Sequence, residues 1–267
     1  MPGGGGEGGG GEEEEEEEEV VVDVVDEGEL VEMLERAAGG PLQATRSILD
    51  GGDGALVAGV DVRGELLAHG AAVLAGAVQP SALASAAQQA RAMLANNQGL
   101  ASPVLASDDA SAHRYRTDRI AWLSRADETT HSDLAAACEA LHLLGDSVIR
   151  ATGARLRGKR EVQLAVYPEG ALYDRHRDAL PLGVDDDIGV GENGELATQA
   201  RRLTIVLYLT SAESDDDGAL RLYLPDGTTR DVAPRTGSAV VFLSGAIDHE
   251  VRRCTGMPRA ALTLWLS

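Results

Sequence analysis

The sequence predicts an α+β protein in which helices come first and a β-barrel or jelly roll follows. From residue 161 onward, apolar and polar residues alternate with a period of two in short segments, and Gly, Asp or Pro separates these segments. Ahead of residue 161, the longest regular segments have helical spacing instead. The candidate strands of the second half are 161–167, 172–178, 203–210, 219–224, 238–243 and 259–266.

The first half contains three candidate helices and two weaker candidate strands. Residues 29–38 place apolar side chains on one side, and Gly39-Gly40-Pro41 ends that helix. Ser81 caps a second helix, which runs to about residue 94. The third helix covers 132–151, and its apolar stripe includes Leu134, Cys138, Leu141, Leu144 and Val148. Strand-like segments are expected at 66–67 with 71–78, and at 118–123.

Most of the negative charge lies near the N-terminus. The chain has 267 residues and a formal net charge of −21. Residues 1–35 hold 15 of the 44 acidic residues and no Lys or Arg, which leaves −6 for residues 36–267. A mildly acidic main part lacks the basic surface that nucleic-acid phosphates require, so we expect no nucleic-acid partner.

Composition divides the chain into three parts. Glycines and eight consecutive glutamates predict a disordered tail over residues 1–28. A helical or irregular extension is expected over 29–64, and the main domain over 65–267, with a flexible loop at 181–199. The loop contains three consecutive aspartates but not the spacing of an EF-hand calcium site.

The sequence also favours an intracellular protein. No apolar run approaches the roughly 18 residues that cross a bilayer, and the N-terminus is unlike a signal peptide. The two cysteines, Cys138 and Cys254, form neither a disulfide framework nor a CxxC metal site. We therefore expect a monomer in the cytoplasm or nucleus, without a membrane partner.

Two of the six histidines stand out because of where they fall. The pattern His-x-Asp occurs at 131–133, where a helix begins and Ser132 and Asp133 serve as cap and first-turn acid. It recurs at His176 and Asp178, in a predicted strand, where positions i and i+2 share a face. His249 is the natural third ligand. Two histidines and one carboxylate suit a non-haem Fe(II) centre, although chance placement or a zinc site remains an alternative.

Arg259 favours the iron interpretation. It begins the predicted strand 259–266, ten positions after His249. A 2-oxo diacid needs a metal to chelate its keto-acid end and a cation to hold its distant carboxylate. Arginine supplies a planar fork that stays charged inside a barrel, whereas an unpaired buried charge would be costly.

Several segments together resemble the prolyl 4-hydroxylase branch of the 2-oxoglutarate/Fe(II) dioxygenases, and most closely the hypoxia-inducible-factor prolyl hydroxylases. The likeness covers roughly residues 65–267. It rests on order, spacing and strand context. The segments are 161–178, 203–209, 218–222, 116–122, and His249-Glu-Val followed by Arg259, Thr263 and Trp265.

The resemblance implies a fold and a set of roles. The fold is a double-stranded β-helix supported by helices. His176, Asp178 and His249 would bind iron, and Arg259 would hold the far carboxylate of 2-oxoglutarate. Tyr208 and Thr263 would add hydrogen bonds to that carboxylate, with Tyr167 lining the same pocket. The residues implied to meet the substrate are Tyr173 and Trp265 beside the iron, and Arg116 and Asp118 in a mobile segment over the peptide.

The implied activity is 4-hydroxylation of a proline in an intracellular protein, with oxygen sensing as a candidate role. Its cofactors are Fe(II), 2-oxoglutarate and O₂, with ascorbate as a further candidate. Relatives that act on collagen-like or cell-wall chains typically have lysine where Arg259 stands, which favours the intracellular branch. The sequence departs from the family pattern at two places. A longer loop follows Asp178, which leaves the identity of the substrate open. The spacing from His249 to Arg259 is one residue longer, which lengthens a turn.

Three other functions remain open from the sequence. A dioxygenase could act on another residue or on a small molecule. A non-catalytic binding module could keep the barrel, although it has no need for four polar inward groups. A zinc hydrolase would need a general base, and the only nearby candidate, Glu250, alternates to the other face from His249.

Overall fold

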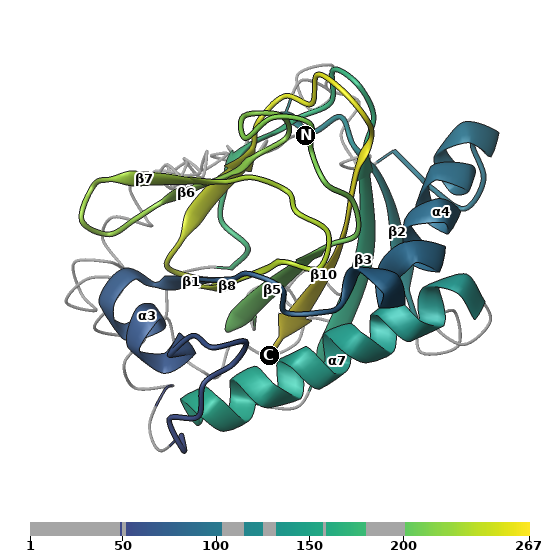
Figure 1. The fold of residues 1–267 in the computed structure, drawn as a ribbon. Coiled ribbons are helices and arrows are strands. Elements are labelled where there is room, and N and C mark those ends of the chain that lie inside the picture. The colour runs from purple at the N-terminus through teal and green to yellow at the C-terminus, as the bar shows by residue number, and fades with distance from the viewer. Residues whose placement is uncertain (1–48, 50–51, 103–114, 125–131, 157–158, 180–200) are drawn as a thin grey trace, which may run out of the picture.

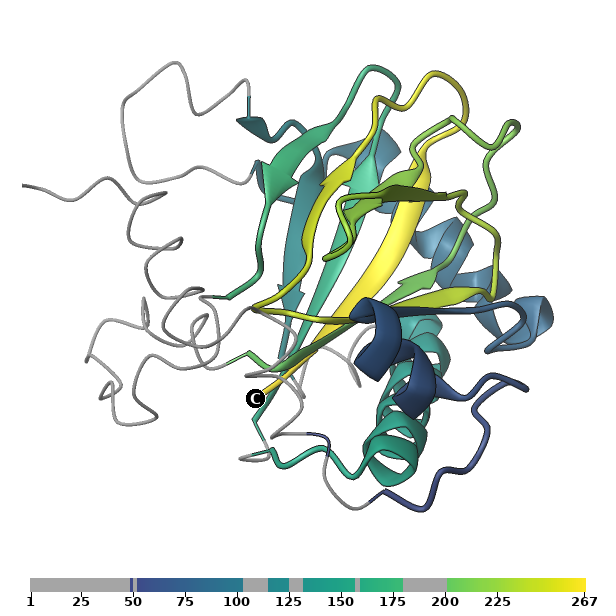
Figure 2. The ribbon, with the colours of Figure 1, turned by 90° about the vertical axis from the view of Figure 1, so that its left-hand side faces the viewer.

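The computed structural model describes residues 49, 52–102, 115–124, 132–156, 159–179 and 201–267. Within them, two antiparallel sheets face each other, and helices cover the outer face of the larger sheet (Figures 1 and 2). The elements in chain order are α3 (Val62–His69), β1 (Ala71–Leu74), α4 (Pro80–Asn96), β2 (Arg119–Leu123), α7 (Ser132–Thr152), β3 (Arg160–Tyr167), β4 (Tyr173–His176), β5 (Leu203–Tyr208), β6 (Leu220–Tyr223), β7 (Thr229–Val232), β8 (Ala239–Leu243), β9 (Asp248–Val251) and β10 (Arg259–Leu266).

The two sheets have the predicted jelly-roll character. The larger has the strand order β1-β8-β5-β10-β3-β2, and the smaller has the order β4-β9-β6-β7. Neighbouring strands pair antiparallel in both sheets. The α+β class with a double-stranded β-helix core is therefore confirmed. Among the described residues, no helix combines the length and apolarity needed to cross a bilayer.

Strand β10 shows how alternation builds two cores. One face is wholly aliphatic and packs toward the helices, with Ala260, Leu262, Leu264 and Leu266. The other face is directed between the sheets and carries the polar groups, with Arg259, Ala261, Thr263 and Trp265. Because successive side chains point to opposite faces, one strand both seals the helical core and lines the interior cavity.

The predicted helices form because their apolar residues fall on one face. In α7 all five residues of the predicted stripe are buried, and α7 and α4 pack against the larger sheet (Figure 1). Helix α4 begins at Pro80, one residue before Ser81, which does not cap it. Proline suits the first helical position because its φ is already helical and its missing N–H has no partner there.

The first predicted strand is wrong in part. Leu66 and Leu67 belong to α3, because the Asp61 carboxylate accepts a hydrogen bond from the Gly64 N–H (2.9 Å) and so caps this helix. Gly70 then ends it with a φ of 74°. The strand that follows, β1, is shorter than the predicted 71–78.

Further differences lie in the second half and at the N-terminus. Strand β4 ends at His176, so Asp178 is beyond it rather than in it. Strands β7 and β9 were not among the predicted segments. The predicted helix 29–38 and loop 181–199 lie outside the described residues. Helix α3 spans the expected domain boundary at residue 65, and the division of the chain stays a prediction.

Candidate metal and co-substrate site

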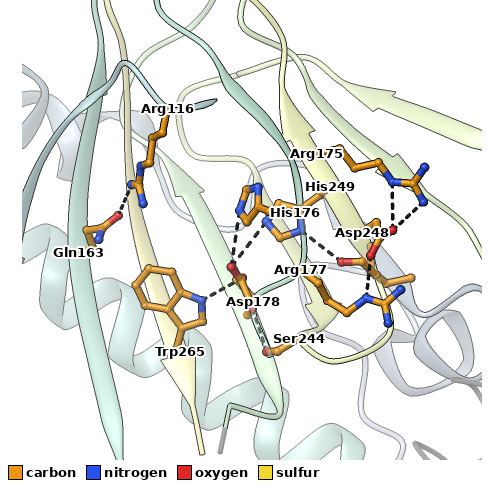
Figure 3. Close-up of polar contacts among 12 residues, drawn as sticks. Arg116, Gln163, Arg175, His176, Arg177, Asp178, Ser244, Asp248, His249 and Trp265 are labelled. Carbon is orange, nitrogen blue, oxygen red and sulfur yellow. Dashed lines mark hydrogen bonds and ion pairs between the residues drawn. The ribbon is translucent and has the colours of Figure 1, made fainter. Parts of the chain in front are cut away.

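Three potential metal ligands meet at the inner face of the smaller sheet (Figure 3). His176 on β4 and His249 on β9 are direct cross-strand partners. Asp178, two residues past His176, places Oδ1 3.7 Å from Nε2 of each histidine. The ligand atoms all lie within 4.8 Å of one another. The structure thus brings together the three residues that the sequence pattern selected.

The Asp178 carboxylate presents one oxygen to this cluster and has the other held by the larger sheet. Its Oδ2 accepts hydrogen bonds from the Thr204 hydroxyl (2.7 Å) and from the Trp265 indole N–H (2.9 Å). Since Thr204 donates to the carboxylate, the 2.9 Å bond between the Thr204 and Ser244 hydroxyls must have Ser244 as its donor. Oδ1, which faces the two histidines, is therefore the oxygen that would be available to a metal.

The protonation states suit metal binding. Burial lowers the pKa of His176 well below its ordinary value, and the neighbouring His249 lowers it further. Burial alone would raise the pKa of Asp178, but the two imidazoles and the bonds from Trp265 and Thr204 hold it below its usual value. A neutral imidazole and an ionised carboxylate are the forms that coordinate a cation.

A cavity of about 240 Å³ opens beside the three ligands. Of the eleven site residues selected from the sequence, two do not line it, Tyr208 and Asp118. The nine that line it are Arg116, Tyr167, Tyr173, His176, Asp178, His249, Arg259, Thr263 and Trp265.

Arg259 lines this cavity and has no acidic partner among the described residues. Its residue exposure is 5%, and its guanidinium carbon is 4.7 Å from the Tyr167 ring centroid and 5.2 Å from that of Tyr208. By geometry, neither Arg259 Nε nor the Tyr208 hydroxyl has a hydrogen-bond partner among the described residues, although the Arg259 guanidinium is close enough to oppose the effect of burial on the pKa of Tyr208. Burial raises the pKa of Tyr208, so its hydroxyl remains a donor. A buried cation and idle donors fit an anionic ligand such as a carboxylate.

Gly218 leaves the space that the Arg259 side chain occupies. The φ of Gly218 is 59°, and a Cβ atom there would lie 2.7 Å from Cys254 Sγ and 3.0 Å from Arg259 Cδ. A larger residue would be strained and would displace the arginine stem.

Arg116 and Asp118 act as a pair. Arg116 donates from Nε to Asp118 Oδ1 (2.7 Å) and from a terminal nitrogen to Gln163 Oε1 (2.9 Å). Its guanidinium also lies 4.3 Å from the Tyr173 ring centroid. Asp118 is 1% exposed, so it contacts the cavity through Arg116. The implied peptide contact by these two residues stays a prediction.

Tyr173 and the two tryptophans form aromatic walls. The Tyr173 ring stacks on His176 at 3.6 Å between centroids, and Trp122 meets Trp265 at 5.4 Å. Trp122 is 52% exposed, which marks the outer part of the cavity. Arg201 lies over the Trp265 ring at 4.0 Å.

Four polar or aromatic residues that line the cavity were given no role by sequence reasoning, as were five apolar ones; the four are Trp122, Gln163, Thr204 and Arg201. Strand alternation could have found two of them. Thr204 lies four residues before Tyr208, and Gln163 lies four before Tyr167, on the same strand faces.

Comparisons with known proteins agree with this geometry. The sequence model of the 2OG-Fe(II) oxygenase superfamily matches residues 162–267. A solved prolyl-4-hydroxylase from Pseudomonas putida is 28% identical, with 79% of this chain and 98% of that chain covered and a TM-score of 0.60. The resemblance of this chain to the 2-oxoglutarate/Fe(II) oxygenase superfamily is therefore confirmed, and Fe(II), 2-oxoglutarate and O₂ are the cofactor and co-substrates that the superfamily implies.

Within that class, the likeness falls in the prolyl 4-hydroxylase branch. A Trichoplax adhaerens prolyl hydroxylase, solved with a hypoxia-inducible-factor peptide, is 24% identical, covers 77% of this chain and 86% of its own, and has a TM-score of 0.59. A non-haem α-ketoglutarate-dependent epimerase from nogalamycin biosynthesis is 14% identical, with 77% and 80% coverage and a TM-score of 0.54. These last two show the fold alone.

The Thr204 hydroxyl gives a first testable prediction. We expect Thr204→Val to weaken Fe(II) binding roughly tenfold, because loss of a group that orients a metal ligand typically has an effect of this order. Thr204→Ser keeps the hydroxyl and should bind Fe(II) like the wild type. Anaerobic titration of both variants with Fe(II) measures the difference. Equal affinity for the valine and serine variants would show that Asp178 needs no support from Thr204.

Proposed function

We propose that the protein is a peptidyl-proline 4-hydroxylase, which couples oxidative decarboxylation of 2-oxoglutarate to hydroxylation of a proline in a protein. The observation that carries the proposal is that one cavity combines the His176, Asp178 and His249 cluster with the buried Arg259, which has no acidic partner among the described residues. The first provides a metal centre, and the second provides a partner for the far end of a diacid.

Each residue has a defined task in the proposed reaction. When bound, Fe(II) supplies the activation of O₂ for decarboxylation and hydroxylation. His176, His249 and Asp178 Oδ1 would hold the metal. Arg259 binds the distant carboxylate of 2-oxoglutarate, with a further hydrogen bond from Tyr208.

Aromatic residues are proposed to position the peptide. Tyr173 stacks on His176 and Trp265 binds Asp178, so both border the space in front of the metal. Flat apolar surfaces of this kind suit a proline ring and exclude water from the reacting atoms. The Arg116–Asp118 pair is proposed to support the outer edge of this surface through Tyr173.

The proposal extends to the setting of the reaction. We propose an intracellular protein substrate, a monomeric enzyme in the cytoplasm or nucleus, and oxygen sensing as its role, with ascorbate as an accessory reductant. The division into a tail, an extension and a catalytic domain from residue 65 belongs to the same proposal.

The decisive experiment combines 2-oxoglutarate turnover with a panel of proline-containing peptides. We expect succinate to form in step with a one-oxygen mass gain on proline, and the gain to disappear when that proline is replaced by alanine. Turnover that is indifferent to every peptide, with oxygen found on no proline, would reject the proposal.

A small-molecule substrate is the second candidate. The observation in its favour is the fold shared with an epimerase of antibiotic biosynthesis. The peptide panel separates the two, because a small-molecule oxygenase would leave all the peptides unmodified. A non-catalytic module would neither bind Fe(II) nor consume 2-oxoglutarate.

A further inference from the structure

Two of the three candidate ligands depend on a weakly supported strand. Strand β4 carries His176 and leads directly into Asp178, and it lies at the edge of the smaller sheet. Its pairing with β9 comprises two aligned pairs, Tyr173 with Val251 and His176 with His249, and the register shifts between them. By contrast, β9 pairs with β6 along four consecutive residues. On the outer side of β4, the described residues add an isolated bridge between Tyr173 and Arg116, so β4 has less regular pairing than β9, which pairs with a strand on each side.

An ionic cluster spans β4 and β9 behind the two histidines. Asp248 Oδ2 accepts hydrogen bonds from Arg175 Nε (3.0 Å) and from a terminal nitrogen of Arg175 (2.6 Å). Its Oδ1 accepts one from Arg177 Nε (2.6 Å). Figure 3 shows these three side chains on one side of His176 and His249, with Asp178 on the other. We call the three residues Arg175, Asp248 and Arg177 the clamp.

The clamp follows from strand alternation. Arg175 precedes His176 in β4 and Asp248 precedes His249 in β9, so these two charged side chains take the face opposite the histidines, and Arg177, just past the end of β4, joins them. The Arg175 guanidinium also lies 4.1 Å from the ring centroid of Tyr223 on β6, and Tyr223 is the cross-strand partner of Asp248. The clamp thus ties the edge strand to the two strands behind it.

The clamp places one carboxylate between two guanidinium groups. Burial alone would raise the pKa of Asp248, but Arg177 and Arg175 hold it below its usual value, so the carboxylate is ionised. The side chains of Asp248 and Arg177 are 21% and 19% exposed, whereas that of Arg175 is 55% exposed. Charge-assisted bonds at partly buried positions hold geometry more firmly than fully exposed pairs do.

We propose that Asp248 is a positioning residue, which aligns His176 and Asp178 with His249 for metal binding by clamping β4 to β9 from behind. This inference rests on the proposed function, because it assigns the clamp to the same metal centre. It concerns the metal affinity of the site rather than the fold, since the cores on both sides of the larger sheet do not include the clamp.

The test uses Asp248→Asn with a matched control on the same sheet. Asp231 on β7 binds Arg221 through two bonds of 2.8 Å and Arg252 through one of 3.3 Å, so it also lies between two arginines. Among the described residues, Asp231 itself bonds to no residue adjacent to a candidate ligand. We expect Asp248→Asn to raise the dissociation constant for Fe(II) by roughly ten- to a hundredfold, as when other groups that orient metal ligands are lost. Asp231→Asn should leave that constant unchanged.

A second variant guards against a trivial loss of folding. Arg177→Met removes the arginine of the clamp that lies just past the end of β4, and it should weaken Fe(II) binding without adding to the effect of Asp248→Asn. Anaerobic Fe(II) titration gives the affinities, and thermal unfolding of the metal-free proteins should show similar losses for Asp248→Asn and Asp231→Asn.

The outcomes separate the clamp from the proposed function. A wild-type protein that binds no Fe(II) would refute the proposed function itself. A wild type that binds Fe(II), with Asp248→Asn binding it no more weakly than Asp231→Asn, would overturn the clamp alone. A lower unfolding temperature of Asp248→Asn with unchanged Fe(II) affinity would also overturn it.

Discussion

Replacing His249 by alanine is expected to abolish 2-oxoglutarate turnover and to lower Fe(II) affinity more than about a hundredfold. Groups that merely orient a metal ligand contribute roughly ten- to a hundredfold to affinity, so losing a ligand should exceed that range. His249 is 5% exposed and faces both His176 and Asp178, which leaves no nearby described side chain to replace it. Fe(II) titration and succinate formation measure the two effects.

The matched control is His69→Ala. His69 is exposed in the last turn of α3 and does not line the cavity. It should retain both metal binding and turnover. Wild-type turnover in a folded His249→Ala protein that has been saturated with Fe(II) would remove His249 from the centre.

Replacing Arg259 by alanine is expected to raise the concentration of 2-oxoglutarate needed for half-maximal turnover by at least about a hundredfold. Breaking a buried ion pair typically costs about 3–5 kcal/mol, and each 1.4 kcal/mol corresponds to a factor of about ten. Fe(II) affinity measured without 2-oxoglutarate should remain that of the wild type, because the metal ligands come from the other sheet.

Arg259→Lys provides the graded control. Lysine keeps the positive charge but loses the planar fork, so its 2-oxoglutarate requirement should lie between those of the wild type and Arg259→Ala. If neither variant changes the concentration of 2-oxoglutarate needed for half-maximal turnover, then 2-oxoglutarate does not bind at Arg259. A parallel loss of Fe(II) affinity would instead show that Arg259 supports the metal centre.

The regular parts of this protein could be predicted because a single physical signal dominates each of them. The five apolar residues of the α7 stripe are buried, and 259–266 was predicted as a strand with the bounds that β10 has. Leu66 and Leu67 were misassigned because the Asp61 cap and the Gly70 terminus, rather than hydrophobicity, decide the local structure.

The main residues of the site could be predicted from the sequence, but the contacts that position them could not. The spacing of His176 and Asp178 suggested a shared face, yet Asp178 lies beyond β4 and is turned inward by Thr204 and Trp265. Those contacts join residues 26 and 87 positions apart, and no local pattern encodes such a distance. The clamp was missed for the same reason, because Arg175 and Asp248 are 73 positions apart.

The depth at which Arg259 lies has a consequence for the sequence of events in a catalytic cycle. Arg259 is 5% exposed, whereas Trp122, which lines the same cavity, is 52% exposed. A diacid seated on the Arg259 guanidinium would sit beneath any chain laid across the outer part of the cavity. 2-Oxoglutarate would then have to bind before the peptide. The product formed from it could leave only after the peptide has dissociated. Steady-state kinetics should accordingly display a compulsory order of arrival, with excess peptide trapping the enzyme in an unproductive state.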